Sequence, residues 1–163
     1  MKFNLENLDD LTRQMMVNEV DHDIINDQLY FSRKFSDTGK MMYTHLLKQA
    51  IIFGNEETLA KSLKVYHCFE SHVPETDHQI FAEHAFNRLH MRATCVRAFE
   101  NGQPFKITHT HQTADHSRTA SETIIDKAAQ LKGLLELLRK NMAVDKAVEL
   151  SMKRSGELTA KAV

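Results

Sequence analysis

Apolar residues recur at spacings of three and four along most of this chain, which is the period of an amphipathic helix. The first series predicts a helix over residues 5 to about 20, whose buried face carries Leu5, Leu8, Leu11 and Met15. We expect Asp21, His22 and Asp23 to interrupt this helix in a solvated acidic corner. The chain therefore begins with a helix that packs one apolar stripe against the rest of the protein.

Two further helices are predicted between residues 36 and 66. Ser36 and Asp37 offer an N-cap for the first, which ends at Gly54. Its apolar stripe is expected to contain Met42, His45, Leu46 and Ile52. Asn55 begins a shorter second helix immediately afterwards. Because the connection is so short, the two helices are expected to form an antiparallel hairpin.

The longest helical segment lies between Pro74 and Pro104, the only prolines in the chain. Thr76 is placed to cap its start, and Gly102 lies where a left-handed residue would end it. Apolar residues cover most of its circumference. The pattern predicts a central buried helix, with one solvent-facing side made of Glu83, Asn87, His90 and Arg97.

A polar stripe at four-residue spacing, His84, Arg88 and Arg92, runs between two apolar arcs of this central helix. An unpaired buried guanidinium is costly, so both arginines need partners. The first alternative is internal pairing with a carboxylate of another helix, and the candidates are Asp21, Asp23 and Glu57. In the second the stripe faces another protein or subunit, and in the third it lines a pocket for an anion.

The segment after Pro104 is the least helical part of the chain. Residues 105–110 alternate well enough for one short strand, but no second strand is evident, so an extended polar connection is expected over 105–118. Thr119 and Glu122 form a capping box that predicts the start of a strongly amphipathic helix. A last helix is predicted over residues 143–154, with a fraying tail.

Four residues of this connection form a candidate metal site: His109, His111, Asp115 and His116. In an extended segment His109 and His111 lie on the same side, and the following turn brings the other two residues near. Imidazole and carboxylate ligands would suit a divalent metal such as zinc, iron or nickel. The alternative is a polar loop that contains histidines by chance, in which case the protein has no cofactor.

The remaining histidines form no metal site, and the common catalytic motifs are absent from the sequence. His78, His84 and His90 are spaced by six residues, so they face three directions of the helix and cannot bind one ion together. The chain contains no nucleophile elbow, dinucleotide-binding glycine loop, metalloprotease helix or paired CxxC. We therefore expect a protein that is not an enzyme.

Composition limits the type of domain and its cellular location more than it limits the function. The 163 residues are 42% hydrophobic and 26% charged, with a formal net charge of -1, which suits one globular domain. Near-neutral charge and the lack of interleaved aromatic residues argue against nucleic-acid binding. There is no signal-peptide pattern or long apolar run, so a cytoplasmic location without membrane contact is expected, with Cys68 and Cys95 reduced.

Together these patterns predict a mainly helical, all-α single domain over residues 1–163, a bundle of about five or six helices. Its parts are a helical body (1–104), the extended connection (105–118) and C-terminal amphipathic helices (119–163). The leading functional hypothesis is a non-catalytic interaction or assembly subunit that binds a protein partner or itself, as in a phage or mobile-element assembly. The alternative is an enzyme or an anion- or metal-binding domain that uses the two candidate clusters.

Overall fold

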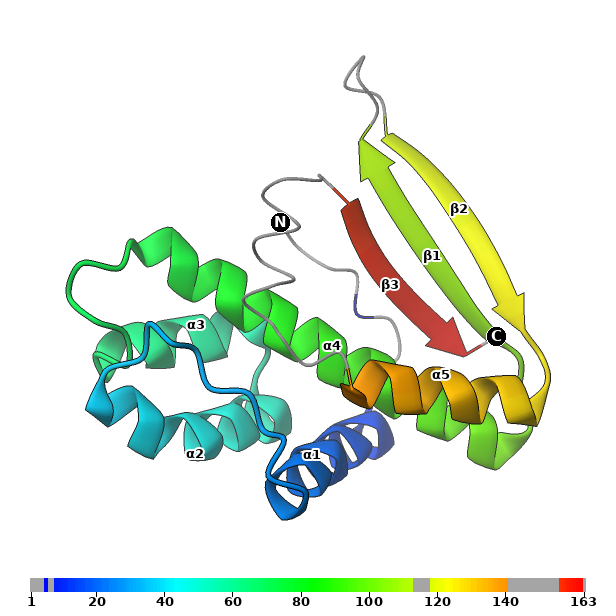
Figure 1. The fold of residues 1–163 in the computed structure, drawn as a ribbon, viewed down its shortest axis with the longest axis horizontal. Helices are drawn as coiled ribbons and strands as arrows, with labels where there is room; N and C mark the ends of the chain where they lie inside the picture. The colour runs from blue at the N-terminus through cyan, green and yellow to red at the C-terminus, as the bar shows by residue number, and fades with distance from the viewer. Residues whose placement is uncertain (1–4, 6–7, 113–117, 141–155, 163) are drawn as a thin grey trace.

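The structure, a computed structural model, describes residues 5, 8–112, 118–140 and 156–162. The described part of the chain is mainly helical, which confirms the predicted fold class (Figure 1). In chain order the elements are α1 (Asp10–Ile25), α2 (Asp37–Phe53), α3 (Glu56–Val65), α4 (Glu75–Asn101), β1 (Phe105–Gln112), β2 (Arg118–Ile125), α5 (Ala128–Lys140) and β3 (Gly156–Ala162). The predicted helix over residues 143–154 lies outside the described residues.

Local capping residues set most helix ends. The side chain of Ser36 accepts a hydrogen bond from the Gly39 amide, and Asn55 and Thr58 form a reciprocal capping box at the start of α3. Gly102 ends α4 in the left-handed conformation, with φ of 62°. The expected cap at Thr76 is wrong, because α4 already begins at Glu75, with Pro74 at the N-cap position.

Helix α1 differs from its prediction in both length and register. It continues through the acidic cluster to Ile25, and Asp23, expected in solvent, is completely buried. Leu11, expected in the core, is 50% exposed. The buried stripe consists of Thr12, Met15, Met16, Glu19, Val20 and Asp23. Two carboxylates thus occupy the buried face of α1, because they have partners on another helix.

The main core fills the space between α1, α2, α3 and the first half of α4. An aromatic cluster lies at its centre, where Phe35 and Phe81 have ring centroids 5.1 Å apart and Phe35 and Phe69 have centroids 4.8 Å apart. Offset and edge-on contacts of this kind add stability beyond the area they bury. The sequence separation of these rings shows that the core ties the loops to the helices.

A smaller second core joins the end of α4 to α5 and to the base of the sheet. Its buried members are Met91, Cys95, Ala98, Phe105 and Leu131. Phe105 is the first residue of β1, so the strand begins inside this core and leads away from it. The second core therefore anchors the sheet to the helical body.

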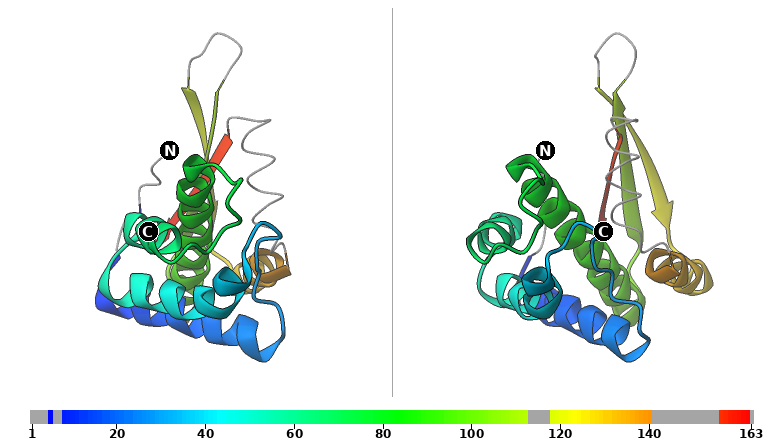
Figure 2. Two further views of the ribbon diagram at one scale, coloured as in Figure 1. Left: turned by 90° about the vertical axis from the view of Figure 1, so that its left-hand side faces the viewer. Right: turned by 60° about the vertical axis from the view of Figure 1, so that its left-hand side comes forward.

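Three antiparallel strands form a sheet in the order β2-β1-β3. Phe105 pairs with Ile125 of β2 and with Ala162 of β3, and Gln112 pairs with Arg118 near the far end. Figures 1 and 2 show the β1–β2 hairpin extending beyond the helices, with β3 alongside α4. Eight extended residues span about 25 Å, which is the approximate reach of this arm.

The sheet corrects two predictions for the C-terminal third. The strand at residue 105 was expected to lack a partner, yet it pairs on both sides. Thr119 and Glu122, which were expected to open a helix, lie in β2, and the amphipathic helix begins at Ala128. A capping-box pattern describes only four residues, so strand pairing over a longer segment overrides it. The tail expected to fray contains β3.

None of the helices in the described ranges is both long enough and apolar enough to cross a membrane.

Candidate functional site

Arg92 is completely buried at the point where α4 crosses α1. Its Nε donates a hydrogen bond to Oε2 of Glu19 at 2.7 Å, and Nη1 and Nη2 donate to the two carboxylate oxygens of Asp23 at 2.7 and 2.8 Å. Both carboxylates are nearly inaccessible to solvent. This fork-shaped pairing satisfies the guanidinium within the protein and leaves it no group for an external ligand.

Glu19 also receives a second arginine, from α5. Arg139 donates to the two Glu19 carboxylate oxygens at 2.6 and 3.0 Å. Burial alone would raise the pKa of Glu19, but the hydrogen bonds and charges of Arg139 and Arg92 outweigh it and hold the pKa below its usual value. Two arginines and two carboxylates thus balance in charge and connect α1, α4 and α5.

Arg88 is the second arginine of the predicted stripe. It is partly buried, and its Nη2 donates to the carbonyl oxygen of Leu138 in α5 at 3.0 Å. Burial and the charge of Arg92 lower the pKa of Arg88 to about 10, against the opposing effect of Asp23. Arg88 therefore remains a cation at neutral pH and helps to hold α5 against α4.

His84 completes the stripe one turn before Arg88. Burial lowers the pKa of its imidazole, although the nearby Glu83 carboxylate acts in the opposite direction. His84 is partly buried. An interface or binding role for His84 and Arg88 stays a prediction.

Internal pairing was one of three alternatives for this stripe, and the structure shows it for Arg92. Its partner Asp23 is one of the carboxylates named from the sequence. Glu19 was missed. Its signal was its position four residues before Asp23, in the same stripe as the buried methionines of α1. Asp21 instead pairs with Lys48 on the surface.

The proposed solvent face of α4 is wrong for three of its four residues. Glu83, Asn87 and His90 are all buried. Arg97 is partly exposed and pairs with Asp9 at 2.6 Å. Helix α4 contacts α1, α3, α5 and β3, so little of its circumference remains for solvent. The sequence indicated no sheet, so the contact between β3 and α4 was not predicted.

The candidate metal site divides between described and undescribed residues. His109 and His111 both lie in β1, two positions apart and therefore on the same face of the strand. Asp115 and His116 lie outside the described residues. Among the residues that the structure describes, no group of three or more histidine, cysteine, aspartate or glutamate side chains is arranged to hold a metal ion. The metal site stays a prediction.

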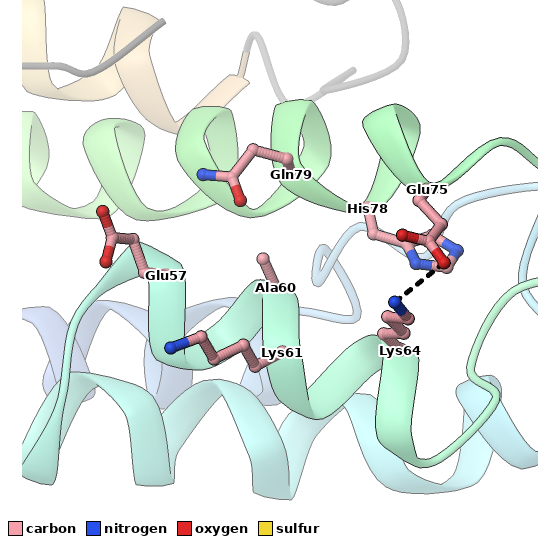
Figure 3. Close-up of a pocket in the computed structure, with 7 residues that line it drawn as sticks. All are labelled: Glu57, Ala60, Lys61, Lys64, Glu75, His78 and Gln79. Atoms are coloured by element: carbon pink, nitrogen blue, oxygen red, sulfur yellow. Dashed lines mark ion pairs between the residues drawn. The ribbon is translucent and has the colours of Figure 1, made fainter.

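A cavity of about 400 Å³ lies between α3 and the first two turns of α4 (Figure 3). Charged residues of both signs line it, together with His78, Gln79 and the small side chain of Ala60. Cavities that bind small molecules have comparable volumes. No pattern in the sequence indicated this site, because its residues come from two helices whose packing brings them together.

Comparison of the chain with models of known protein families, with curated proteins and with solved structures found no match. The class of this protein is accordingly given by its architecture, a mainly helical body that carries a three-stranded antiparallel sheet.

Proposed function

We propose that this protein is a non-catalytic interaction subunit whose α2–α3 helix pair binds a protein partner. The observation that carries the proposal is the exposure of large apolar side chains on this pair. Met41 is 84% exposed, Phe53 is 79% exposed and Val65 is 68% exposed. Large apolar groups in contact with water mark interaction surfaces when they gather on one part of a molecule.

The exposed groups lie at both ends of the antiparallel pair. Met41 is in the first turns of α2, near the end of α3, because Ser36 donates hydrogen bonds to the backbone carbonyl oxygens of His67 and Cys68. Val65 therefore lies at the same end as Met41.

At the opposite end, Ile52 and Phe53 are exposed beside the start of α1. Arg13 of α1 donates to the carbonyl oxygens of Ile51 and Gly54 at 2.7 Å each. This contact brings the half-exposed Leu11 toward the same end. Ile52 had been expected in the core, but the buried stripe of α2 passes through Leu47 and Ile51 instead. The pair thus offers exposed apolar groups at both of its ends.

The pairing of Arg92 within the fold supports this function over an enzymatic one. A catalytic or anion-binding arginine needs donors directed at its ligand. Arg92 directs them at Glu19 and Asp23. The alternative, a metal- or anion-binding domain, would depend on His84, Arg88 and the histidines of β1.

We extend the proposal to the kind of assembly and its location. A second copy of this chain is the first partner to test, and a phage or mobile-element assembly is a hypothesis about class. Both cysteines are buried free thiols, which is compatible with the cytoplasmic location we propose. A stable interface would bury about 800 Å² on each partner.

Sedimentation velocity from micromolar to millimolar concentration tests self-association. We expect the mass of the wild-type protein to rise above the 18.8 kDa of one chain, and the double variant Phe53→Lys/Val65→Lys to remain at that mass. Gln49→Lys, at an exposed polar position of α2, serves as the matched control and should behave like the wild type. A wild-type protein that stays monomeric throughout would contradict self-association through this surface.

A further inference from the structure

His78, in the first turn of α4, has an imidazole ring whose surroundings suit only its neutral form. One face of the ring stacks on Phe69, with centroids 4.5 Å apart and an angle of 19° between the planes. Both ring nitrogens are screened from solvent, and no described part of the protein offers either of them a hydrogen-bond partner. An imidazolium donates from both nitrogens, so protonation here would bury a charge and two donors without an acceptor.

Phe69 is the residue through which the segment between α3 and α4 joins the main core. Its ring contacts the rings of Phe35 and Phe81, and its backbone forms an isolated β-bridge with Phe35. The stacked ring of His78 helps to cover Phe69, which is only 6% exposed. Displacement of His78 would therefore uncover an aromatic ring and loosen the segment that carries it.

Charged groups of both signs act on the His78 ring. Burial has the largest effect and lowers the pKa of His78, and the Lys64 ammonium group lowers it further. Glu75 and Asp77 act in the opposite direction. Both carboxylates already have cationic partners, because Glu75 pairs with Lys64 at 2.8 Å and Asp77 pairs with Lys34 at 2.7 Å. The stacked ring thus binds a proton less readily than a ring in water.

The cavity beside the ring gives His78 room to move and a carboxylate to reach. Figure 3 shows His78 next to Glu75, which lies one turn earlier in α4 and pairs with Lys64. The side chains of this ion pair are 57% and 72% exposed. Exposed pairs contribute little stability, so Glu75 is able to exchange Lys64 for an imidazolium. The other charged or acid-titrating groups near this site line the cavity farther along α3 (Glu57, Lys61) or are exposed on the segment (His67, Glu70, His72).

We propose that His78 is an acid-operated latch that holds the segment of residues 67–74 against α4. The neutral ring stacks on Phe69 and keeps the segment closed. A protonated ring leaves Phe69, pairs with the carboxylate of Glu75 and allows the segment to open. The proposal does not depend on the interaction surface described above.

The direction of the pH effect follows from the difference between the two states. The pKa of His78 is lower in the closed segment than in the open one, so the closed state has its full stability above the ordinary histidine pKa. This stability is lost as pH falls toward the lower pKa of the closed state. Because one proton is involved, the equilibrium changes by at most about tenfold for each unit of pH.

Hydrogen exchange at the Glu70 and Ser36 amides tests the latch. In the closed segment these amides donate to the carbonyl oxygens of Lys34 and Cys68, at 2.9 Å each. We expect their protection, corrected for the intrinsic exchange rate, to fall by about tenfold from about pH 7 to about pH 5. Protection that stays constant over this range would overturn the proposal.

A variant of the ring separates His78 from the other histidines. His78→Phe keeps an aromatic ring on Phe69 but cannot be protonated, so the two amides should be equally protected at both pH values. His72→Phe, at an exposed position of the segment, is the matched control and should lose protection as the wild type does. An acid loss that persists in His78→Phe would belong to another group, such as His84, and would overturn the proposal.

Two charge variants test the latch without changing the ring. Lys64→Met removes the competitor for Glu75, so the segment should open at a higher pH than in the wild type. Glu75→Gln removes the acceptor for the imidazolium, so the segment should open at a lower pH. These opposite shifts are expected because Lys64 lowers the pKa of His78 and Glu75 raises it. Shifts in one direction, or none, would show that protonation of His78 does not control the segment and would overturn the proposal.

Discussion

The helical body and the α5–sheet region are held together by different forces. Among the described residues, the main core contains 21 buried apolar residues and the second core contains five. The second region compensates with polar contacts, in which Arg139 reaches Glu19 and Arg88 reaches the carbonyl oxygen of Leu138. Because apolar burial is the dominant stabilising force, we infer that α5 and the sheet open before the body does.

Loss of Arg92 should cause the largest decrease in the free energy of unfolding, and this decrease should concern the helical body. Arg92→Met leaves Glu19 with Arg139 alone and leaves Asp23 as a buried carboxylate without its partner. Removal of one member of a buried pair costs about 3–5 kcal/mol. Urea unfolding measures the loss. The triple variant Arg92→Met/Glu19→Gln/Asp23→Asn should recover part of the stability, and a single variant as stable as the wild type would refute this role.

Gly39→Ala tests the close contact between α2 and the loop after α3. A Cβ atom at this position would meet the carbonyl oxygen of Cys68, and the Ser36 amide also bonds to that oxygen at 2.9 Å. Overpacking against backbone costs about 1–3 kcal/mol, measured by chemical unfolding. Gly133→Ala in α5 is the control, since its Cβ would meet nothing within 4 Å. Equal stability of the two variants would contradict the contact.

Arg139→Met should affect α5 and spare the body. The variant keeps the aliphatic stem but loses the two hydrogen bonds to Glu19, each of which contributes about 1.5–3 kcal/mol when charged groups take part. Because Arg139 is 26% exposed, the lower part of this range is expected. Hydrogen exchange should become faster in α5 and stay unchanged in α2 and α3. A uniform acceleration over all helices would show that the two regions unfold as one unit.

The smallest effect is expected in how the free energy of unfolding depends on pH in the acid range. The pKa of Glu19 is lower in the folded protein than in the unfolded chain, so its contribution is fully present above the ordinary carboxyl pKa. The contribution is lost as pH falls through the folded value. Glu19→Gln should therefore flatten the decline of unfolding free energy in acid. An unchanged slope would show that Glu19 is not a linked group.

The helical body was largely predictable because its signals are local. Ser36, Gly54, Asn55 and Gly102 act on their own turns of backbone, and each lies where the sequence placed a helix end. The sheet was missed because strand pairing joins residues as distant as Phe105 and Ala162. A single sequence contains no periodic signal for such a contact.

The candidate site divides in the same way. The alignment of His84, Arg88 and Arg92 on one face of α4 followed from helical spacing alone. Asp23 was among the three carboxylates named as candidate partners, but Glu19 was missed, because it approaches Arg92 from 73 residues away. The cavity beside His78 also depends on how two helices pack, and its lining follows no sequence motif.

The sequence by itself determined the helical class, the boundaries of α2 and α3 and the burial of a long central helix, since propensity, capping and periodicity act within a few turns. Only the tertiary structure decided which polar residues are buried, which partners satisfy them and which apolar residues remain exposed. Burial depends on what covers each face of a helix, and that cover comes from distant segments. Arg92 illustrates both: helical spacing placed it in the polar stripe of α4, and the tertiary structure enclosed it between Glu19 and Asp23.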